Sequence, residues 1–158
     1  MTPRPRLCFA PPFSDHAVFQ RDRPIPIWGS AVPLEWITVY FAESSASTIS
    51  DLNGRWMVRL PPCNAGGPYE LIVRTASCEA CISDVFIGEV WIASGQSNME
   101  WKMIATGQGL AAAEFDLPGI RLLTINTPAR RGRQTEVDGR WTVATKKTLG
   151  DFSAVAAW

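Results

Sequence analysis

The sequence predicts an antiparallel β-sandwich of the immunoglobulin or jelly-roll type over residues 1–87, followed by the truncated start of an α/β domain over residues 88–158. Two observations predict this division. Before residue 88, short segments rich in β-branched and aromatic residues recur between turn residues, without helical periodicity. After Gly88 the pattern changes to a continuous apolar run and then to a candidate helix, which is typical of an α/β unit.

The first strands are predicted between residues 17 and 42. Residues 17–29 form two short extended pieces on either side of a break that ends at Pro24. Pro24 and Pro26 exclude a helix and place the second piece at a sheet edge or a bulge. Residues 36–42 are rich in β-branched and aromatic side chains, which favour a strand.

The remaining strands of the first unit follow at similar spacing. A turn is expected over residues 51–54, which end in Asn-Gly, and residues 55–60 then alternate polar and apolar side chains as in a half-buried strand. Residues 61–68 are predicted to be a loop. Two further strands are expected over residues 69–74 and 82–87.

The second unit begins with an apolar run over residues 89–94, which predicts a strand buried on both faces. We expect a helix over 110–115, a strand over 120–125 and an extended piece over 141–144. A final helix is predicted to begin at residue 152, capped by Asp151 or Ser153. Because the chain ends on Trp158 within this helical pattern, the sequence predicts a truncated domain.

Composition excludes several functional classes. Of the 158 residues, 46% are hydrophobic and 19% are charged, and the formal net charge is zero. This composition is that of a globular protein without the basic surface that nucleic acids or anionic membranes bind. No apolar run reaches the roughly 18 residues of a membrane-spanning helix. Residues 1–8 lack the hydrophobic stretch of a signal peptide, so no leader is expected, and the compartment stays open.

Four cysteines do not predict a metal site or a disulfide framework. Cys78 and Cys81 have the spacing of half a zinc site or of a redox pair, but the only histidine is His16 and the segment has no βαβ context. We therefore interpret these cysteines as thiols in a strand hairpin and expect neither a metal nor another cofactor.

The candidate chemistry lies at Ser97, which follows Gly95 and Gln96 at the end of the predicted buried strand. Open α/β sheets bind ligands at the carboxyl ends of their strands. Glycine permits a tight turn, and the backbone N–H of Ser97 can face a developing oxyanion. A serine nucleophile also requires a base, usually a histidine held by an aspartate. Gly-x-Ser alone is a common tripeptide with mostly structural roles.

Longer runs carry a resemblance to a known family. In chain order they are Ser14–Arg21, Pro24–Gly29, Ala65–Tyr69, Gly88–Trp101 and Phe152–Ala156. These runs resemble the sialate O-acetylesterase family, and the most specific is Gly95-Gln96-Ser97-Asn98-Met99-Glu100-Trp101. The resemblance implies an SGNH-type hydrolase domain that removes acetyl groups from sugar hydroxyls, and a periplasmic or secreted location for the full-length family. It also implies that Ser97 is the nucleophile and that its backbone N–H is one oxyanion donor.

The other catalytic groups that the resemblance implies fall outside this sequence. These are the Asp–His pair and the remaining oxyanion donors of the family, which lie beyond Trp158. His16 precedes a predicted strand and is interpreted as a structural or surface residue. The chain alone is therefore expected to be inactive. Gln96 and Asn98 either contact substrate or stabilise the turn, with the second role favoured for Asn98, and Trp101 is a candidate wall of the substrate pocket.

Two alternatives to an esterase fragment remain open. One is a non-catalytic carbohydrate-binding β-sandwich, whose sugar binding would survive deletion of residues 88–158. The other is a non-functional remnant, which would be poorly soluble because the incomplete sheet exposes the apolar edge over residues 90–93. For the esterase, the expected partner is an acetylated carbohydrate.

Overall fold

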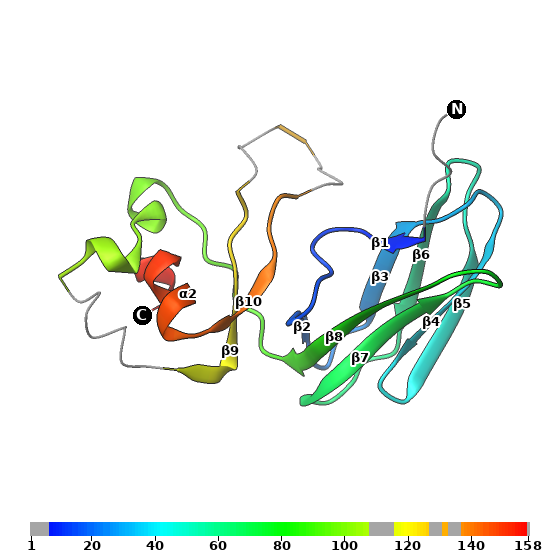
Figure 1. Cartoon of the computed structure of the whole chain (residues 1–158), viewed down its shortest axis with the longest axis horizontal. Coiled ribbons are helices and arrows are strands. Elements are labelled where there is room, and N and C mark those ends of the chain that lie inside the picture. The colour runs from blue at the N-terminus through cyan, green and yellow to red at the C-terminus, as the bar shows by residue number, and fades with distance from the viewer. Residues whose placement is uncertain (1–6, 108–115, 127–130, 133–136, 158) are drawn as a thin grey trace.

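The computed structural model describes residues 7–107, 116–126, 131–132 and 137–157 (Figure 1). Strands between Cys8 and Gly88 form a three-stranded and a five-stranded sheet, and the rest of the described chain lies beside them. The strands of the two sheets are β1 (Cys8–Phe9), β2 (Val18–Gln20), β3 (Ile25–Ser30), β4 (Trp36–Phe41), β5 (Ser44–Ile49), β6 (Arg55–Leu60), β7 (Gly66–Arg74) and β8 (Glu79–Gly88).

The three-stranded sheet has the order β1-β3-β6 and is antiparallel throughout. Because β1 pairs only with Gly29 and Ser30 of β3, no described strand covers the β3 edge beside Pro26. The edge or bulged position predicted for the whole strand is wrong, because β3 is the middle strand of this sheet, but Pro26 itself lies where no second described strand needs its missing N–H. Gly29 is required in β3 because a β-carbon there would collide with the carbonyl oxygen of Cys8 and with the Trp56 ring.

The five-stranded sheet has the order β2-β8-β7-β4-β5. Its β4, β5, β7 and β8 pair antiparallel, in line with the predicted antiparallel arrangement of this unit, but β2 runs parallel to β8, so the sheet is mixed. The long chain segment between β2 and β8 permits this parallel pairing. β5 was not predicted because Ser44–Ile49 has little apolar character. It forms through a hairpin with β4, in which Trp36 pairs with Ile49.

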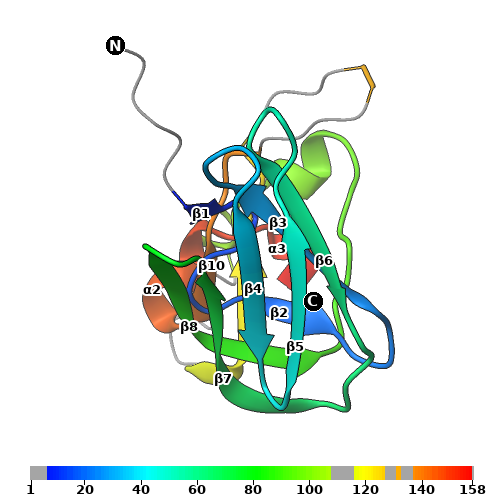
Figure 2. The ribbon, with the colours of Figure 1, turned by 90° about the vertical axis from the view of Figure 1, so that its right-hand side faces the viewer.

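One hydrophobic core takes side chains from both sheets. In β6, Trp56, Val58 and Leu60 are buried while the residues between them are exposed, which confirms the predicted half-buried strand. Phe41 of β4 is only 1% exposed and contacts the rings of Phe19 and Tyr69. Strands β4, β5 and β6 are seen along their length in Figure 2. The shared core makes the two sheets one packed body.

The remaining part contains a two-stranded antiparallel sheet and short helices (Figure 1). Strands β9 (Leu117–Leu123) and β10 (Trp141–Ala144) confirm the extended segments predicted there. The expected C-terminal helix is α3 (Ala154–Ala157), and Ser153 caps it by accepting a hydrogen bond from the Ala156 N–H at 3.3 Å. Helix α2 (Lys146–Asp151) was missed, although Thr145 forms a capping box with Thr148. The helix predicted over 110–115 lies outside the described residues.

The strand predicted over residues 89–94 is wrong in this structure. The segment has no strand pairing, and Trp91 and Ile92 are 89% and 91% exposed. A strand buried on both faces needs hydrogen-bonded neighbours and covering elements. Among the described residues, no strand pairs with this segment, so the Trp91 and Ile92 side chains face solvent.

A buried arginine joins the two parts of the chain. Arg121 of β9, whose side chain is 5% exposed, donates from Nη2 to Oδ2 of Asp84 in β8 at 3.0 Å and lies over the Phe86 ring. His16 Nδ1 donates to the same carboxylate oxygen at 2.7 Å. His16 therefore lies at this junction, in the structural role interpreted from the sequence.

The junction predicts a pH-dependent contribution to stability. The hydrogen bond from His16 lowers the pKa of Asp84, and Arg121 adds to this effect against an opposing contribution from burial. The lowered pKa is that of Asp84 in the folded state, and its pKa in the unfolded chain is about 4. Ionised Asp84 therefore stabilises the fold fully at pH values above the unfolded pKa. This stabilisation is lost as the pH falls through the lower, folded-state pKa. The free energy of unfolding in urea should therefore differ between wild type and Asp84→Asn at about pH 5, and the difference should shrink toward about pH 2.5. A difference independent of pH would contradict this assignment.

Candidate active site

Ser97 is the first residue of a short 3₁₀ helix, η1 (Ser97–Glu100), and it is exposed. The turn is closed by backbone hydrogen bonds from Met99 N–H to the Gln96 carbonyl at 2.9 Å and from Trp101 N–H to the Asn98 carbonyl at 3.3 Å. The Ser97 hydroxyl makes no hydrogen bond with another described residue. It is therefore accessible to a substrate and to a proton acceptor.

Gly95 fits the tight turn predicted before Ser97. A β-carbon at Gly95 would lie 3.3 Å from the Met99 β-carbon, closer than ordinary packing allows. The side chains of Gln96 and Asn98 are exposed and make no hydrogen bond within the described part of the chain. The turn therefore depends on its backbone and on Gly95, and the two amide side chains are available for other contacts.

A backbone pairing from the C-terminal segment supports the Ser97 turn from one side. Ala154 N–H donates to the Trp101 carbonyl at 2.8 Å, and Met103 N–H donates to the Phe152 carbonyl at 3.0 Å. Met103, in the short helix η2 (Met103–Ala105), and Ala154 are buried against each other. Ser153 Oγ lies 3.4 Å from Met99 Sδ. Together these contacts, which local sequence reasoning missed, hold the end of η1 against α3.

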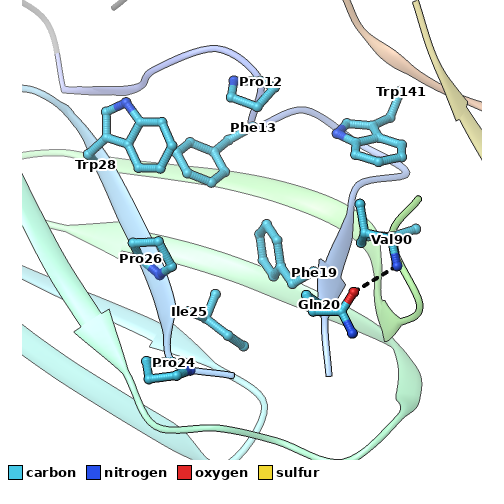
Figure 3. Close-up of a pocket in the computed structure, with 11 residues that line it drawn as sticks. Pro12, Phe13, Phe19, Gln20, Pro24, Ile25, Pro26, Trp28, Val90 and Trp141 are labelled. Carbon is cyan, nitrogen blue, oxygen red and sulfur yellow. Dashed lines mark hydrogen bonds between the residues drawn. The ribbon is translucent and has the colours of Figure 1, made fainter. Parts of the chain in front are cut away.

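A side-chain contact holds the chain on the other side of Ser97. Gln20, the last residue of β2, accepts a hydrogen bond from Val90 N–H at 2.9 Å (Figure 3). It also donates one to Glu89 Oε2 at 3.0 Å. Arg21 N–H donates to the Gly88 carbonyl at 2.9 Å. The resemblance runs Ser14–Arg21 and Gly88–Trp101 therefore meet in space, but spacing along the sequence gave no sign of the contact.

The apolar hollow drawn in Figure 3 is separate from Ser97. It encloses about 230 Å³ between β2, β3 and the loop before β2, and its wall includes Phe13, Phe19, Trp28, Val90 and Trp141. Neither Ser97 nor Trp101 lines it. Trp101, predicted as a pocket wall, is 56% exposed beside the Ser97 turn.

The residues that would complete a catalytic triad are not gathered at Ser97 in the described part of the chain. The only histidine of the sequence, His16, is bound to Asp84 at the junction with β9. The described residues also contain no cluster of three or more histidine, cysteine, aspartate or glutamate side chains suited to a metal ion. None of the helices in these described residues has the length and apolar character needed to span a bilayer.

Comparison with known proteins confirms the resemblance seen in the sequence, although no family model matches the chain. The sialate O-acetylesterase of Homo sapiens is 28% identical over 142 residues, which cover 78% of this chain and 27% of that protein. The Mus musculus sialate O-acetylesterase is 27% identical over 139 residues, covering 78% of this chain and 26% of that protein. The chain thus spans about a quarter of the length of the curated relatives it matches.

A solved structure gives a similar result. The crystal structure of a carbohydrate acetylesterase from Xanthomonas citri matches 95% of this chain with a TM-score of 0.89 and 36% sequence identity, and the match covers 35% of that chain. The similarity therefore includes both the sheets and the segment that carries Ser97.

Proposed function

We propose that this chain carries the nucleophile of a serine carboxylesterase that removes O-acetyl groups from sugars, with Ser97 as that nucleophile. The observation that carries the proposal is the exposed Ser97 hydroxyl on a turn that is anchored on both sides. Similarity to a carbohydrate acetylesterase over 95% of the chain supports the reaction class. The substrate would be an acetylated carbohydrate, and the chemistry needs neither a metal nor another cofactor.

The reaction proceeds in two steps through an acetyl-serine. Ser97 Oγ attacks the acetyl carbonyl carbon while its proton passes to a base, and the backbone N–H of Ser97 donates to the developing oxyanion. Collapse breaks the bond to the sugar oxygen, which leaves as a hydroxyl after taking that proton. Water then attacks the acetyl-serine carbonyl, which releases acetate and restores the Ser97 hydroxyl. Gln96 and Asn98 flank this centre, and Trp101 would form one wall for the sugar.

We further propose two units, a β-sandwich over residues 1–87 and the start of an SGNH-type α/β domain over residues 88–158. In this arrangement the base and its carboxylate come from residues outside these 158. A periplasmic or secreted enzyme fits the family resemblance.

The 158-residue chain alone is expected to be inactive as an esterase. It should hydrolyse aryl acetates and O-acetylated sialic acid no faster than a control protein that contains no serine. The reason is that its single histidine is bound to Asp84 and no other imidazole is present to activate Ser97. A fusion of this chain to the remaining portion of the Xanthomonas citri esterase should be active on at least one of these esters. The measurement is initial-rate kinetics on both proteins.

A fluorophosphonate probe identifies the nucleophile in the active fusion. Mass spectrometry of the labelled protein should place the adduct on Ser97. Hydrolysis accompanied by labelling at another serine would overturn the assignment. Sugar binding without any hydrolysis by the fusion would favour the carbohydrate-binding alternative.

A further inference from the structure

The amide of Gln20 extends the pairing between β2 and β8 beyond the end of both strands. The parallel ladder ends where Gln20 pairs with Gly88. Past that point, the Gln20 side chain substitutes for a backbone peptide group, because its Oε1 accepts the Val90 N–H and its Nε2 donates to the Glu89 carboxylate. The guanidinium of Arg21 lies 3.6 Å from the other Glu89 oxygen. Both Glu89 and Val90 are therefore fixed to the edge of the five-stranded sheet.

No comparable contact follows until the Ser97 turn. Residues 91–95 are exposed and make no hydrogen bond with any other described residue. The segment that leads to Ser97 is thus held at its start by the hydrogen bond at Val90 and beyond Ser97 by the pairing of Trp101 with Ala154. At Val90 the contact depends on the Gln20 side chain alone, whereas Gly88 and Glu89 are also held by Arg21.

The surroundings of Gln20 favour a well-defined hydrogen bond. Figure 3 shows its amide directed at the Val90 N–H, with the Phe19 and Trp141 rings on the wall of the same apolar hollow. The bond to Val90 is partly buried. Removing the Gln20 acceptor would leave the Val90 N–H without its partner in a partly apolar setting. The backbone at Val90 would then move until this N–H finds another hydrogen-bond acceptor.

We propose that Gln20 is a positioning residue for the esterase reaction. Its side chain fixes the backbone position at Glu89 and Val90, and this position in turn determines how the Ser97 hydroxyl approaches the acetyl carbon. The inference rests on the proposed function. A serine nucleophile displaced by about 1 Å can lose on the order of 100-fold in rate, although it still binds the substrate. In this proposal Gln20 acts through its hydrogen bond to Val90 and not through contact with the substrate.

The first test uses the unmodified 158-residue chain and requires no activity. Gln20→Ala should accelerate hydrogen exchange of the Val90 amide by about tenfold or more, because the side-chain acceptor is lost. Asn64→Ala is the matched control, since the exposed Asn64 amide makes no hydrogen bond within the described residues. If the hydrogen-exchange rate of the Val90 amide is unchanged in Gln20→Ala, the proposed role of Gln20 in holding Val90 is overturned.

The second test uses the fusion with the Xanthomonas citri portion. Gln20→Ala should lower kcat by about 10- to 100-fold with KM and the melting temperature nearly unchanged. Gln20→Glu should also lower kcat, because it places a carboxylate against Glu89. Combining Gln20→Glu with Glu89→Gln exchanges donor and acceptor while preserving both hydrogen bonds, and it should restore most of kcat. A role confined to stability would instead lower the melting temperature and give no such rescue.

The outcomes separate this inference from the proposed function. If the unmodified fusion shows no hydrolysis that depends on Ser97, the proposed function fails and the positioning role fails with it. If hydrolysis depends on Ser97 but kcat is the same in wild type and Gln20→Ala, only the positioning role is overturned.

Discussion

Replacing Ser97 by alanine in the fusion esterase is expected to lower kcat/KM for an acetylated sugar by at least about 1000-fold. The substitution removes the attacking oxygen, and the remaining backbone donors and binding contacts give only residual catalysis. Because the Ser97 side chain is exposed and makes no hydrogen bond with another described residue, its loss should leave the free energy of unfolding unchanged within about 0.5 kcal/mol. Steady-state kinetics and urea unfolding of the same preparations measure the two effects.

The chain offers a matched control three residues earlier. Ser94 is also exposed, but it lies in the unpaired segment before the Ser97 turn and does not follow Gly95 and Gln96. Ser94→Ala should retain kcat/KM within about threefold, since no transition-state contact is removed. Equal losses in the two variants would indicate damage to the segment and not removal of a nucleophile, and would count against Ser97 as the reacting group.

The sheet strands could be predicted where one face of the strand is buried. In β6 the apolar side chains at Trp56, Val58 and Leu60 recur every second residue, which directly reflects burial against the core. β5 lacked that signal, because its serine and threonine side chains contribute little to the core and its position depends on the hairpin with β4. The parallel direction of β2 depends on a partner almost seventy residues away, which local pattern cannot specify.

The candidate site was predictable only at its centre. The Gly95-Gln96-Ser97 sequence indicated an exposed turn, which the structure contains. The two anchors were not predictable, because each joins segments distant in sequence: Gln20 with Val90, and Trp101 with Ala154. The strand expected over residues 89–94 failed for a related reason, since an apolar run specifies a buried strand only when partner strands are present.

Phe41→Ala is expected to cost about 3–5 kcal/mol of unfolding free energy, the usual range for deleting a buried aromatic ring. Phe41 is 1% exposed, and its ring centroid lies 5.2 Å from that of Phe19 and 5.6 Å from that of Tyr69, both in edge-to-face geometry. Removing the ring leaves a cavity in the core shared by the two sheets and also loses both aromatic contacts. Urea unfolding of the 158-residue chain, followed by tryptophan fluorescence, measures the change.

Tyr40 provides the comparison, because it precedes Phe41 on β4 and its side chain points to the opposite face. It is 40% exposed, and the Arg74 guanidinium lies 5.5 Å from its ring centroid. Tyr40→Ala should therefore cost no more than about 1 kcal/mol. Similar losses for Tyr40→Ala and Phe41→Ala would contradict the assignment of β4's inner and outer faces. Phe41 packs on Phe19, the residue before Gln20. The cavity left by Phe41→Ala should therefore also loosen β2 and accelerate hydrogen exchange of the Val90 amide, which is bonded to Gln20. This effect would link the core to the segment that leads to Ser97.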